Sequence, residues 1–362
     1  MSTPNTVPAF SHATSLVAVT AISPTTSSTL TMAATLQQLG IHTPETLDTL
    51  CVLESQKPFV VDGLISTGSI GLAVGDSGLG KSPLIYQLGL CVAAGIPWLG
   101  MRTAEGPVVY LDCENGPLNS QALRDSLLQH LGLPKCPKMF FFCYNISNIH
   151  HLARILKAIK PVLVIIDTLR SFDPNAEENN TKAGEFIRSL RGLCQEYKTS
   201  FLIVHHTKKP QQGGGLFNTS PNLELADSSL QWFNQACGAR ALVNQTDFRI
   251  GIDQTSQANA SLVVRGNVRV RGEFGPFFLA RAFDDDEQPI GYRRLSGVEF
   301  LMTDQQAAFN KLPLAFTLKV AKTEYGRQDQ ATIDFLKKCI QLGIVRKVER
   351  GKYEKVIHAT AE

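Results

Sequence analysis

The eight residues from Gly75 to Ser82 constrain this chain more than any other segment. They read Gly-Asp-Ser-Gly-Leu-Gly-Lys-Ser and match the phosphate-binding loop pattern G-x-x-x-x-G-K-[ST] in full. Glycines at the first and sixth positions permit backbone angles that a Cβ would forbid, so successive N–H groups can wrap an anion. The predicted phosphate-binding residues are therefore Gly75, Asp76, Ser77, Gly78, Leu79, Gly80, Lys81 and Ser82.

The flanking residues have the context that such a loop requires. Residues 69–74 form a short apolar run that indicates a buried strand, and residues 84–94 are apolar and compatible with a helix. Pro83 falls in the first helical turn, where its missing N–H costs little. Within this context we expect Lys81 to reach the β- and γ-phosphates and the Ser82 hydroxyl to ligate Mg²⁺. A glycine turn that matches by chance is the alternative.

Apolar strands and helices alternate after the loop. The pattern predicts strands at residues 108–111, 139–142, 162–166 and 201–204, with helices at 118–131, 149–159 and 183–197 between them. Continuous apolar strands separated by helices are typical of a parallel sheet covered on both faces. Further strands, expected to be antiparallel, follow at 247–252, 260–265, 277–282 and 290–295. The predicted fold class is α/β, with a mostly parallel central sheet and an antiparallel extension.

Composition divides the chain into further segments. Residues 1–31 hold 14 Ser/Thr and three Pro, so we expect a disordered leader over 1–32, followed by a small helical lead-in over 33–57. The α/β core is expected over 58–300. Residues 304–362 are expected to form a small winged helix-turn-helix domain, with helices at 304–310, 315–323 and 329–342 and a hairpin at 344–348 and 353–357.

Charge is concentrated near the end of the chain. The net charge of +3 identifies no partner by itself, but residues 311–362 hold 11 Lys/Arg and 6 Asp/Glu, a balance of +5, which leaves about −2 for the rest. A basic segment on a near-neutral body predicts contact with a polyanion. On the expected wing, the residues that would contact phosphates are Arg346, Lys347, Arg350 and Lys352; a winged helix used only for protein contacts is the alternative.

Carboxylates follow two of the predicted strands. Asp167 comes directly after a run of aliphatic residues, the position of a Walker B aspartate that holds the Mg²⁺ shell; an aspartate that caps a helix is the alternative. Glu114 ends a neighbouring strand, where a carboxylate can polarise an attacking water; a surface charge is the alternative. Asp112 is a rival for the same role.

Histidines and arginines complete the candidate site. His205 and His206 end the fifth strand, and either of them suits the role of a γ-phosphate sensor, with a structural histidine as the alternative. Arg269 and Arg271 lie between two late strands and suit the role of arginine fingers, which enter a neighbouring subunit's site and stabilise charge there. Solvated strand charges are the alternative, and Arg240 is a rival finger.

The eight cysteines and the apolar pattern exclude other classes. The cysteines form no C-x-x-C pair, so neither a zinc ribbon nor a redox motif is supported, and buried thiols in a reducing cytosol are expected. No apolar run reaches transmembrane length, and the first charged residue is Glu45, so a basic signal-peptide region is missing. We therefore expect a cytoplasmic protein with no membrane partner.

Taken together, these motifs resemble the RecA-like ATPases of the plasmid replicative helicase RepA type. The resemblance spans roughly residues 58–295 and rests on the following motifs: Gly63-Leu64-Ile65, Gly75–Ser82, Ala94-Gly95-Ile96-Pro97-Trp98-Leu99-Gly100, Tyr110-Leu111-Asp112-Cys113-Glu114, Ile166-Asp167-Thr168 and Val204-His205-His206-Thr207-Lys208-Lys209. It implies a hexameric or other ring-forming ATPase that uses ATP and Mg²⁺ at sites between subunits. In that family's terms Glu114 would be the catalytic base, Asp167 the Walker B acid, and His206 or His205 the γ-phosphate sensor.

Two functions remain open at this stage. In the first, ATP hydrolysis in a ring moves loops near residues 208–215 along single-stranded DNA, as in a helicase or translocase of replication or mobile-element maintenance. In the second, ATP controls the assembly of a DNA-bound regulator without unwinding, and the winged helix delivers it to duplex DNA. A small-molecule kinase is disfavoured, because nothing in the sequence resembles a substrate lid.

Overall fold

The structure is a computed structural model. It describes Pro44 and residues 59–144, 146, 148–207, 225, 229–236, 238, 240–257, 259–342 and 344–356. The expected leader and helical lead-in therefore lie outside the described residues apart from Pro44, and so does the expected DNA loop at 208–215. The chain divides into two units, Met1–Gln56 and Lys57–Glu362, and every element below belongs to the second.

A nine-stranded mixed sheet forms the centre of this unit, in the order β11-β10-β9-β8-β3-β7-β6-β4-β5. Its strands in chain order are β3 (Ile70–Gly75), β4 (Val108–Asp112), β5 (Phe140–Cys143), β6 (Leu163–Asp167), β7 (Ser200–His206), β8 (Phe248–Asp253), β9 (Leu262–Val268), β10 (Gly272–Phe283) and β11 (Pro289–Arg294). The strands from β3 to β8 are parallel, and β9 to β11 extend the sheet in antiparallel fashion. The predicted fold class is confirmed.

One strand was assigned to the wrong part of the sheet by the sequence pattern. Residues 247–252 were expected to begin the antiparallel extension, but β8 pairs in parallel with β3 and in antiparallel fashion only with β9. β8 is therefore the strand at which the sheet changes direction. Its first residue, Phe248, lies opposite Gly71. A Cβ on Gly71 would come 2.2 Å from the Phe248 ring, so the close approach of the two residues requires glycine there.

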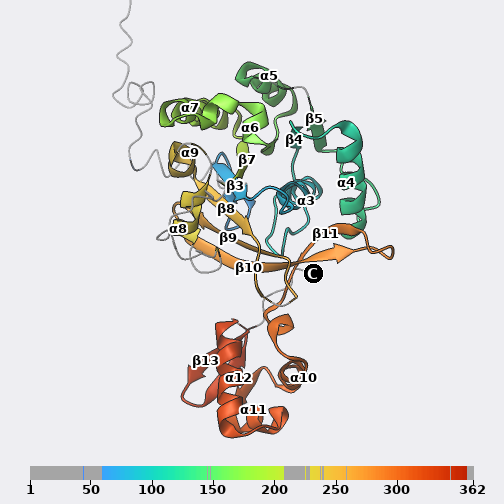
Figure 1. Ribbon diagram of the computed structural model, residues 1–362, viewed down its shortest axis with the longest axis vertical. Helices are drawn as coiled ribbons and strands as arrows, with labels where there is room; N and C mark the ends of the chain where they lie inside the picture. Colours follow the sequence, from blue (N-terminus) through green and yellow to red (C-terminus); the bar gives the residue numbers. More distant parts are fainter. Residues whose placement is uncertain are drawn as a thin grey trace, which may run out of the picture. The chain divides into compact units, whose positions relative to one another are not determined.

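Helices cover both faces of the sheet (Figure 1). α3 (Lys81–Ala94) and α4 (Pro117–His130) lie on one side, and α5 (Ile149–Ile159) and α7 (Asn180–Tyr197) on the other. The shorter elements of the core are β1 (Phe59–Val61), β2 (Ile65–Ser66), α6 (Leu169–Phe172), η1 (Pro174–Glu177), α8 (Ser229–Trp232), η2 (Phe233–Gln235) and α9 (Arg240–Gln245). None of the helices that the structure describes has both the length and the apolar character needed to cross a bilayer.

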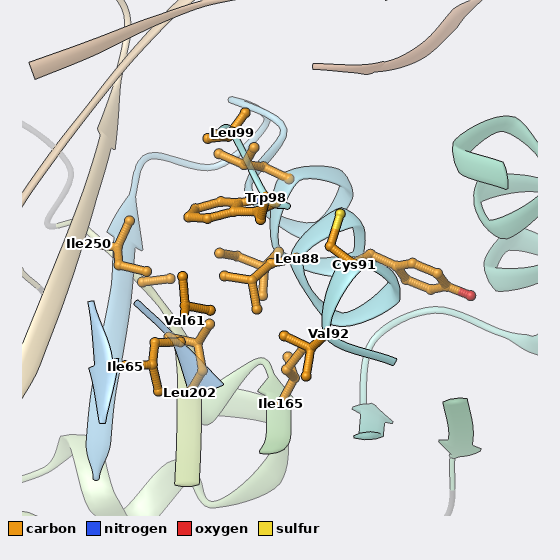
Figure 2. Packing of buried hydrophobic residues seen from close by; sticks show 14 of the residues in the cluster. Val61, Ile65, Leu88, Cys91, Val92, Trp98, Leu99, Ile165, Leu202 and Ile250 are labelled. Carbon is orange, nitrogen blue, oxygen red and sulfur yellow. The ribbon is translucent and has the colours of Figure 1, made fainter. Parts of the chain in front are cut away.

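Side-chain alternation divides the apolar residues into two layers. On β6, Leu163 and Ile165 pack in the layer with α3, whereas Val164 and Ile166 pack in the layer with α5 and α7. Figure 2 shows the first layer, where Leu88 and Val92 of α3 lie over strand residues such as Ile165. All of these side chains are fully buried, so the sheet is held between two apolar layers.

The C-terminal segment, residues 297–356, has its own apolar core and a three-stranded sheet in the order β12-β14-β13. Its elements are η3 (Gly297–Phe300), α10 (Thr303–Lys311), β12 (Ala315–Thr317), α11 (Leu318–Tyr325), α12 (Asp329–Gln341), β13 (Val345–Glu349) and β14 (Lys352–Lys355). The helix expected over 315–323 was wrong at its start. Residues 315–317 pair with β14, and the Thr317 side chain then caps α11 by accepting the Val320 N–H at 3.4 Å.

Candidate phosphate-binding site

The Gly75–Ser82 loop joins the end of β3 to the start of α3. Gly78 and Gly80 have φ angles of +79° and +91°, which residues with a Cβ rarely adopt. The N-terminus of α3 has no side-chain cap and no acidic residue in its first turn. Its N–H groups are therefore available to an anion, and the helix dipole favours a negative charge at this position.

Lys81 is the first residue of α3 and is 5% exposed. Its Nζ donates a hydrogen bond to the Asp76 carbonyl oxygen at 2.7 Å and lies 3.3 Å from His206 Nδ1. Burial lowers the pKa of Lys81, and the nearby charges of Asp167, Asp76 and Glu114 oppose this effect. The loop thus holds a cation in a poorly solvated place, where its attraction for phosphate is strengthened.

Asp167 ends β6 and is buried at 1% exposure. Burial raises the pKa of this carboxyl group to about 6, although a 2.5 Å hydrogen bond from the Tyr110 hydroxyl and a weaker interaction with the Ser82 hydroxyl lower it. Its Oδ1 is buried, and no donor among the described residues lies in hydrogen-bonding geometry to it. A buried carboxylate that retains an open oxygen beside a hydroxyl has the chemistry of an Mg²⁺ site.

The number of protein ligands at this point is small. No group of three or more His, Cys, Asp or Glu side chains among the described residues could hold a metal ion. Mg²⁺ is usually bound through one or two protein oxygens together with substrate phosphates and water. Ser82 and Asp167 fit that mode.

Glu114 follows β4 and faces the same site, with 42% of its side chain exposed. Its Oε1 accepts hydrogen bonds from Thr168 Oγ1 at 2.6 Å and Ser171 Oγ at 3.3 Å. The same oxygen lies 4.0 Å from His206 Nε2. The carboxylate is therefore held by two hydroxyl groups from the segment after β6 and remains accessible to water.

The two consecutive histidines point to opposite faces of β7. His206 contacts Lys81 and faces Glu114, and burial followed by the Lys81 charge lowers the pKa of its imidazole. His205 is fully buried and lies 3.4 Å from Glu177 Oε1. The interaction with His205, together with Arg170, lowers the pKa of Glu177 to about 2. Of the two candidates, only His206 lies at the phosphate-binding loop.

Asp112, the rival to Glu114, has a different position. It is 3% exposed, and its Oδ1 accepts hydrogen bonds from the backbone N–H groups of Glu114 at 3.3 Å and Asn115 at 2.8 Å. Its Oδ2 accepts the Ser120 hydroxyl. Oδ1 therefore holds the turn that carries Glu114 and Oδ2 is bound by α4, so the geometry favours Glu114 over Asp112 as the candidate base.

Arg269 and Arg271 lie apart from the loop within this chain. Val268, next to Arg269, pairs with Phe248, which in turn pairs with Gly71 near the amino end of β3. Arg269 and Arg271 are therefore at the end of the sheet opposite the phosphate-binding loop, and Arg269 Nη2 donates to the Asn244 carbonyl at 2.8 Å. Arg240 begins α9, next to the start of α7.

Three residues of this site were given no role by the sequence analysis. Tyr110, Ser171 and the side chain of Thr168 position the two carboxylates. Tyr110 could have been noticed as the one hydroxyl within an apolar strand, two positions before Asp112 and thus on the same side of β4. Thr168 and Ser171 are hydroxyl residues one and four positions after Asp167, but their bonds to Glu114 depend on the pairing of β4 with β6.

Comparison with known proteins gives two findings. Residues 47–212, which include the loop and all four strands that carry the site, match the AAA domain family. Among solved structures, the chain is similar to a KaiC-like protein from the hyperthermophilic archaeon Pyrococcus horikoshii OT3, with 15% sequence identity and a TM-score of 0.41 over 66% of this chain and 97% of that one. The family match and the strand–loop–helix geometry support a P-loop ATPase core.

Proposed function

We propose that this chain binds ATP with Mg²⁺ at Gly75–Ser82 and hydrolyses it. The observation that carries the proposal is the meeting of four side chains from four segments far apart in sequence. Lys81, Glu114, Asp167 and His206 lie together at the carboxyl ends of neighbouring parallel strands. Ligands of open α/β sheets bind at such ends.

Each residue has a defined part in this chemistry. The amides of the loop and Lys81 bind the phosphates and hold the γ-phosphate in place. Ser82 and Asp167 would hold Mg²⁺, which neutralises charge on the phosphate oxygens when bound. Glu114, oriented by Thr168, polarises the attacking water. His206, which touches Lys81 and faces Glu114, responds to the presence of the γ-phosphate.

We further propose a ring-forming DNA helicase or translocase of the RepA type. The position of Arg269 and Arg271 supports this reading, because arginines at the opposite end of the sheet from their own loop are suited to a neighbouring subunit's site. A hexamer would place one ATP between each pair of subunits, and single-stranded DNA would pass through the ring.

The C-terminal segment supplies the proposed duplex contact. Its order of helices and strands, α10-β12-α11-α12-β13-β14, agrees with a winged helix, in which α12 would approach the major groove. On the wing, Lys347 and Arg350 are exposed, Arg346 pairs with Glu354 at 2.6 Å, and Lys352 pairs with Glu349. These cations would contact phosphates. A DNA-bound regulator whose assembly is set by ATP uses the same segment and is the second candidate function.

ATP turnover with and without single-stranded DNA tests the proposal. Lys81→Ala removes the phosphate cation and should abolish both binding and turnover, whereas Glu114→Gln should retain binding and lose turnover by about 100-fold or more. Asp125→Asn changes a surface carboxylate paired with Arg124 and serves as the control. Wild-type protein that hydrolyses no nucleotide under any condition would refute the ATPase assignment.

A forked DNA duplex separates the two candidate functions. A helicase displaces one strand in an ATP-dependent manner, and Glu114→Gln stops the displacement. A regulator leaves the fork annealed, although ATP changes the size of the assembly measured by light scattering. Lys347→Ala and Arg350→Ala should weaken duplex binding and reduce its salt dependence in either case.

A further inference from the structure

Tyr292 of β11 lies against the phosphate-binding loop, although more than 200 residues separate the two in sequence. Its side chain is 4% exposed, and its hydroxyl lies 3.5 Å from the Leu79 carbonyl oxygen. A Cβ on Gly80 would come 2.0 Å from the same hydroxyl oxygen. The Tyr292 side chain therefore limits how the loop can move at Leu79 and Gly80.

The backbone of Tyr292 is fixed by two side chains from other elements. The buried Gln87 of α3 donates from Nε2 to the Tyr292 carbonyl at 2.9 Å and accepts the Tyr292 N–H at 3.1 Å on Oε1. His130, the last residue of α4, donates from Nε2 to the same carbonyl at 2.9 Å. β11 is an edge strand, so Gln87 takes the place of a further strand at this point.

β11 leads directly into the C-terminal segment. Two residues after Tyr292 the strand ends, and Gly297 begins η3. Arg293 Nη1 donates to Glu299 Oε1 at 2.7 Å, and Glu299 Oε2 accepts the Ser296 N–H at 2.7 Å. The short connection is thus ordered by its own hydrogen bonds, and it joins the strand clamped to α3 with the residues that enter the C-terminal core, beginning at Val298.

We propose that Tyr292, clamped by Gln87 and His130, is a positioning residue that couples occupancy of the phosphate-binding loop to the connection at 293–301. Closing of the loop on the phosphates displaces Leu79 and Gly80, which the Tyr292 side chain touches. Gln87 and His130 hold the backbone of Tyr292, so Tyr292 cannot move independently of α3. The displacement of the loop is therefore passed to β11 and to the connection. By thermodynamic reciprocity, a ligand of the C-terminal segment changes the affinity of the loop for nucleotide.

This inference rests on the proposed function, since it takes ATP as the ligand of the loop. Hydrogen–deuterium exchange of the full chain, with and without ATP and Mg²⁺, measures both events in one experiment. In the wild type, ATP should slow exchange at least about threefold in the loop peptide and also in the peptide that covers 290–301. Gln87→Leu should retain the response of the loop and lose that of the connection.

Three further variants and one control variant complete the design. Gln87→Glu, which keeps the acceptor but replaces the donor to the Tyr292 carbonyl, should weaken the response of the connection even if Gln87→Leu folds poorly. Tyr292→Ala should lose that response, and Tyr292→Phe, which keeps the ring, should retain most of it. Arg281→Ala is the matched control, because Arg281 is exposed and pairs directly with Tyr292 across the hairpin.

The outcomes distinguish this inference from the function on which it rests. Loop protection without any change at 290–301 in the wild type would overturn the coupling and leave the ATPase proposal intact. Protection of neither segment would overturn both. A full response at 290–301 in Gln87→Leu and Gln87→Glu would show that the clamp is not the route, and the inference would fall.

Discussion

Replacing Asp167 with asparagine should make the ligand-free protein more stable at neutral pH. Asp167 is 1% exposed, and burial raises its pKa from 3.8 to about 6. The group therefore favours folding when protonated, and this contribution is lost as the pH rises from 3.8 through 6. Two pKa units correspond to about 3 kcal/mol of destabilisation by the ionised form above pH 7.

Urea denaturation at several pH values, in EDTA and without nucleotide, measures this effect. An asparagine side chain cannot ionise, so Asp167→Asn should raise the free energy of unfolding by up to about 3 kcal/mol at pH 8. The shift from 3.8 to about 6 predicts that the advantage shrinks by roughly 1.4 kcal/mol between pH 8 and pH 5. The same variant should lose the stabilisation that Mg²⁺ and ATP give the wild type, because it removes a proposed metal ligand.

Asp112→Asn is the matched control, since it makes the same substitution at the end of the neighbouring strand. Asp112 accepts hydrogen bonds from Glu114, Asn115 and Ser120, so an amide NH₂ at that position would face donors. We expect a loss of about 1–3 kcal/mol at neutral pH. If Asp167→Asn is less stable than the wild type at pH 8, or if its advantage is the same at pH 5, the buried carboxylate is not a source of strain.

Three other predictions concern positions outside the loop. Glu177→Gln should lower the free energy of unfolding by up to about 3 kcal/mol at pH 7, because interaction with His205 lowers the pKa of Glu177 from 4.5 to about 2. This stabilisation is lost as the pH falls through that range, so the loss should be less than half as large at pH 3, and a pH-independent difference in urea denaturation would contradict the prediction. Thr168→Val should reduce kcat roughly tenfold and change the KM for ATP less than twofold, since Thr168 orients Glu114 without a predicted phosphate contact; a rise in KM alone in steady-state kinetics would contradict it. Gly266→Ala should destabilise the fold by at least about 2 kcal/mol, because its Cβ would lie 2.0 Å from the Arg249 carbonyl oxygen. Gly192→Ala, on an exposed face of α7, should instead stabilise the fold by about 0.5–1 kcal/mol, so thermal melts should show a lower Tm for the first variant and a higher Tm for the second.

Local patterns were sufficient to predict much of the fold. α5 begins and ends at the residues expected from its apolar period, and Asn148 caps it by accepting the His151 N–H at 2.8 Å. Residues 315–317 were misassigned because the short sequence Ala-Phe-Thr suits either a helix or a strand. It becomes a strand because it pairs with β14, more than 30 residues further along the chain, and the local sequence does not identify that partner.

The candidate site shows the same limit in another form. Strand alternation requires that His205 and His206 point to opposite faces, so the sequence already restricted the sensor to one of them. Which one faces the loop depends on the pairing of Gly75 with His206 across β3 and β7. The other face of β7 carries His205, whose buried imidazole lies beside the Glu177 carboxylate and has a structural role. The choice between neighbours was therefore a question of long-range pairing.

The position of the arginines follows from strand direction. Parallel strands bring their carboxyl ends to one edge of the sheet, which is why Glu114, Asp167 and His206 could be grouped from the sequence. Beyond β8 the chain reverses, so the turn after β9 returns to the amino end of β3 and carries Arg269 and Arg271 with it. A residue that follows a strand thus lies near the loop or far from it according to the direction of that strand. For these arginines to stabilise charge on an ATP phosphate, the ATP must be bound to another copy of the chain, and this requirement ties the proposed finger to the proposed ring.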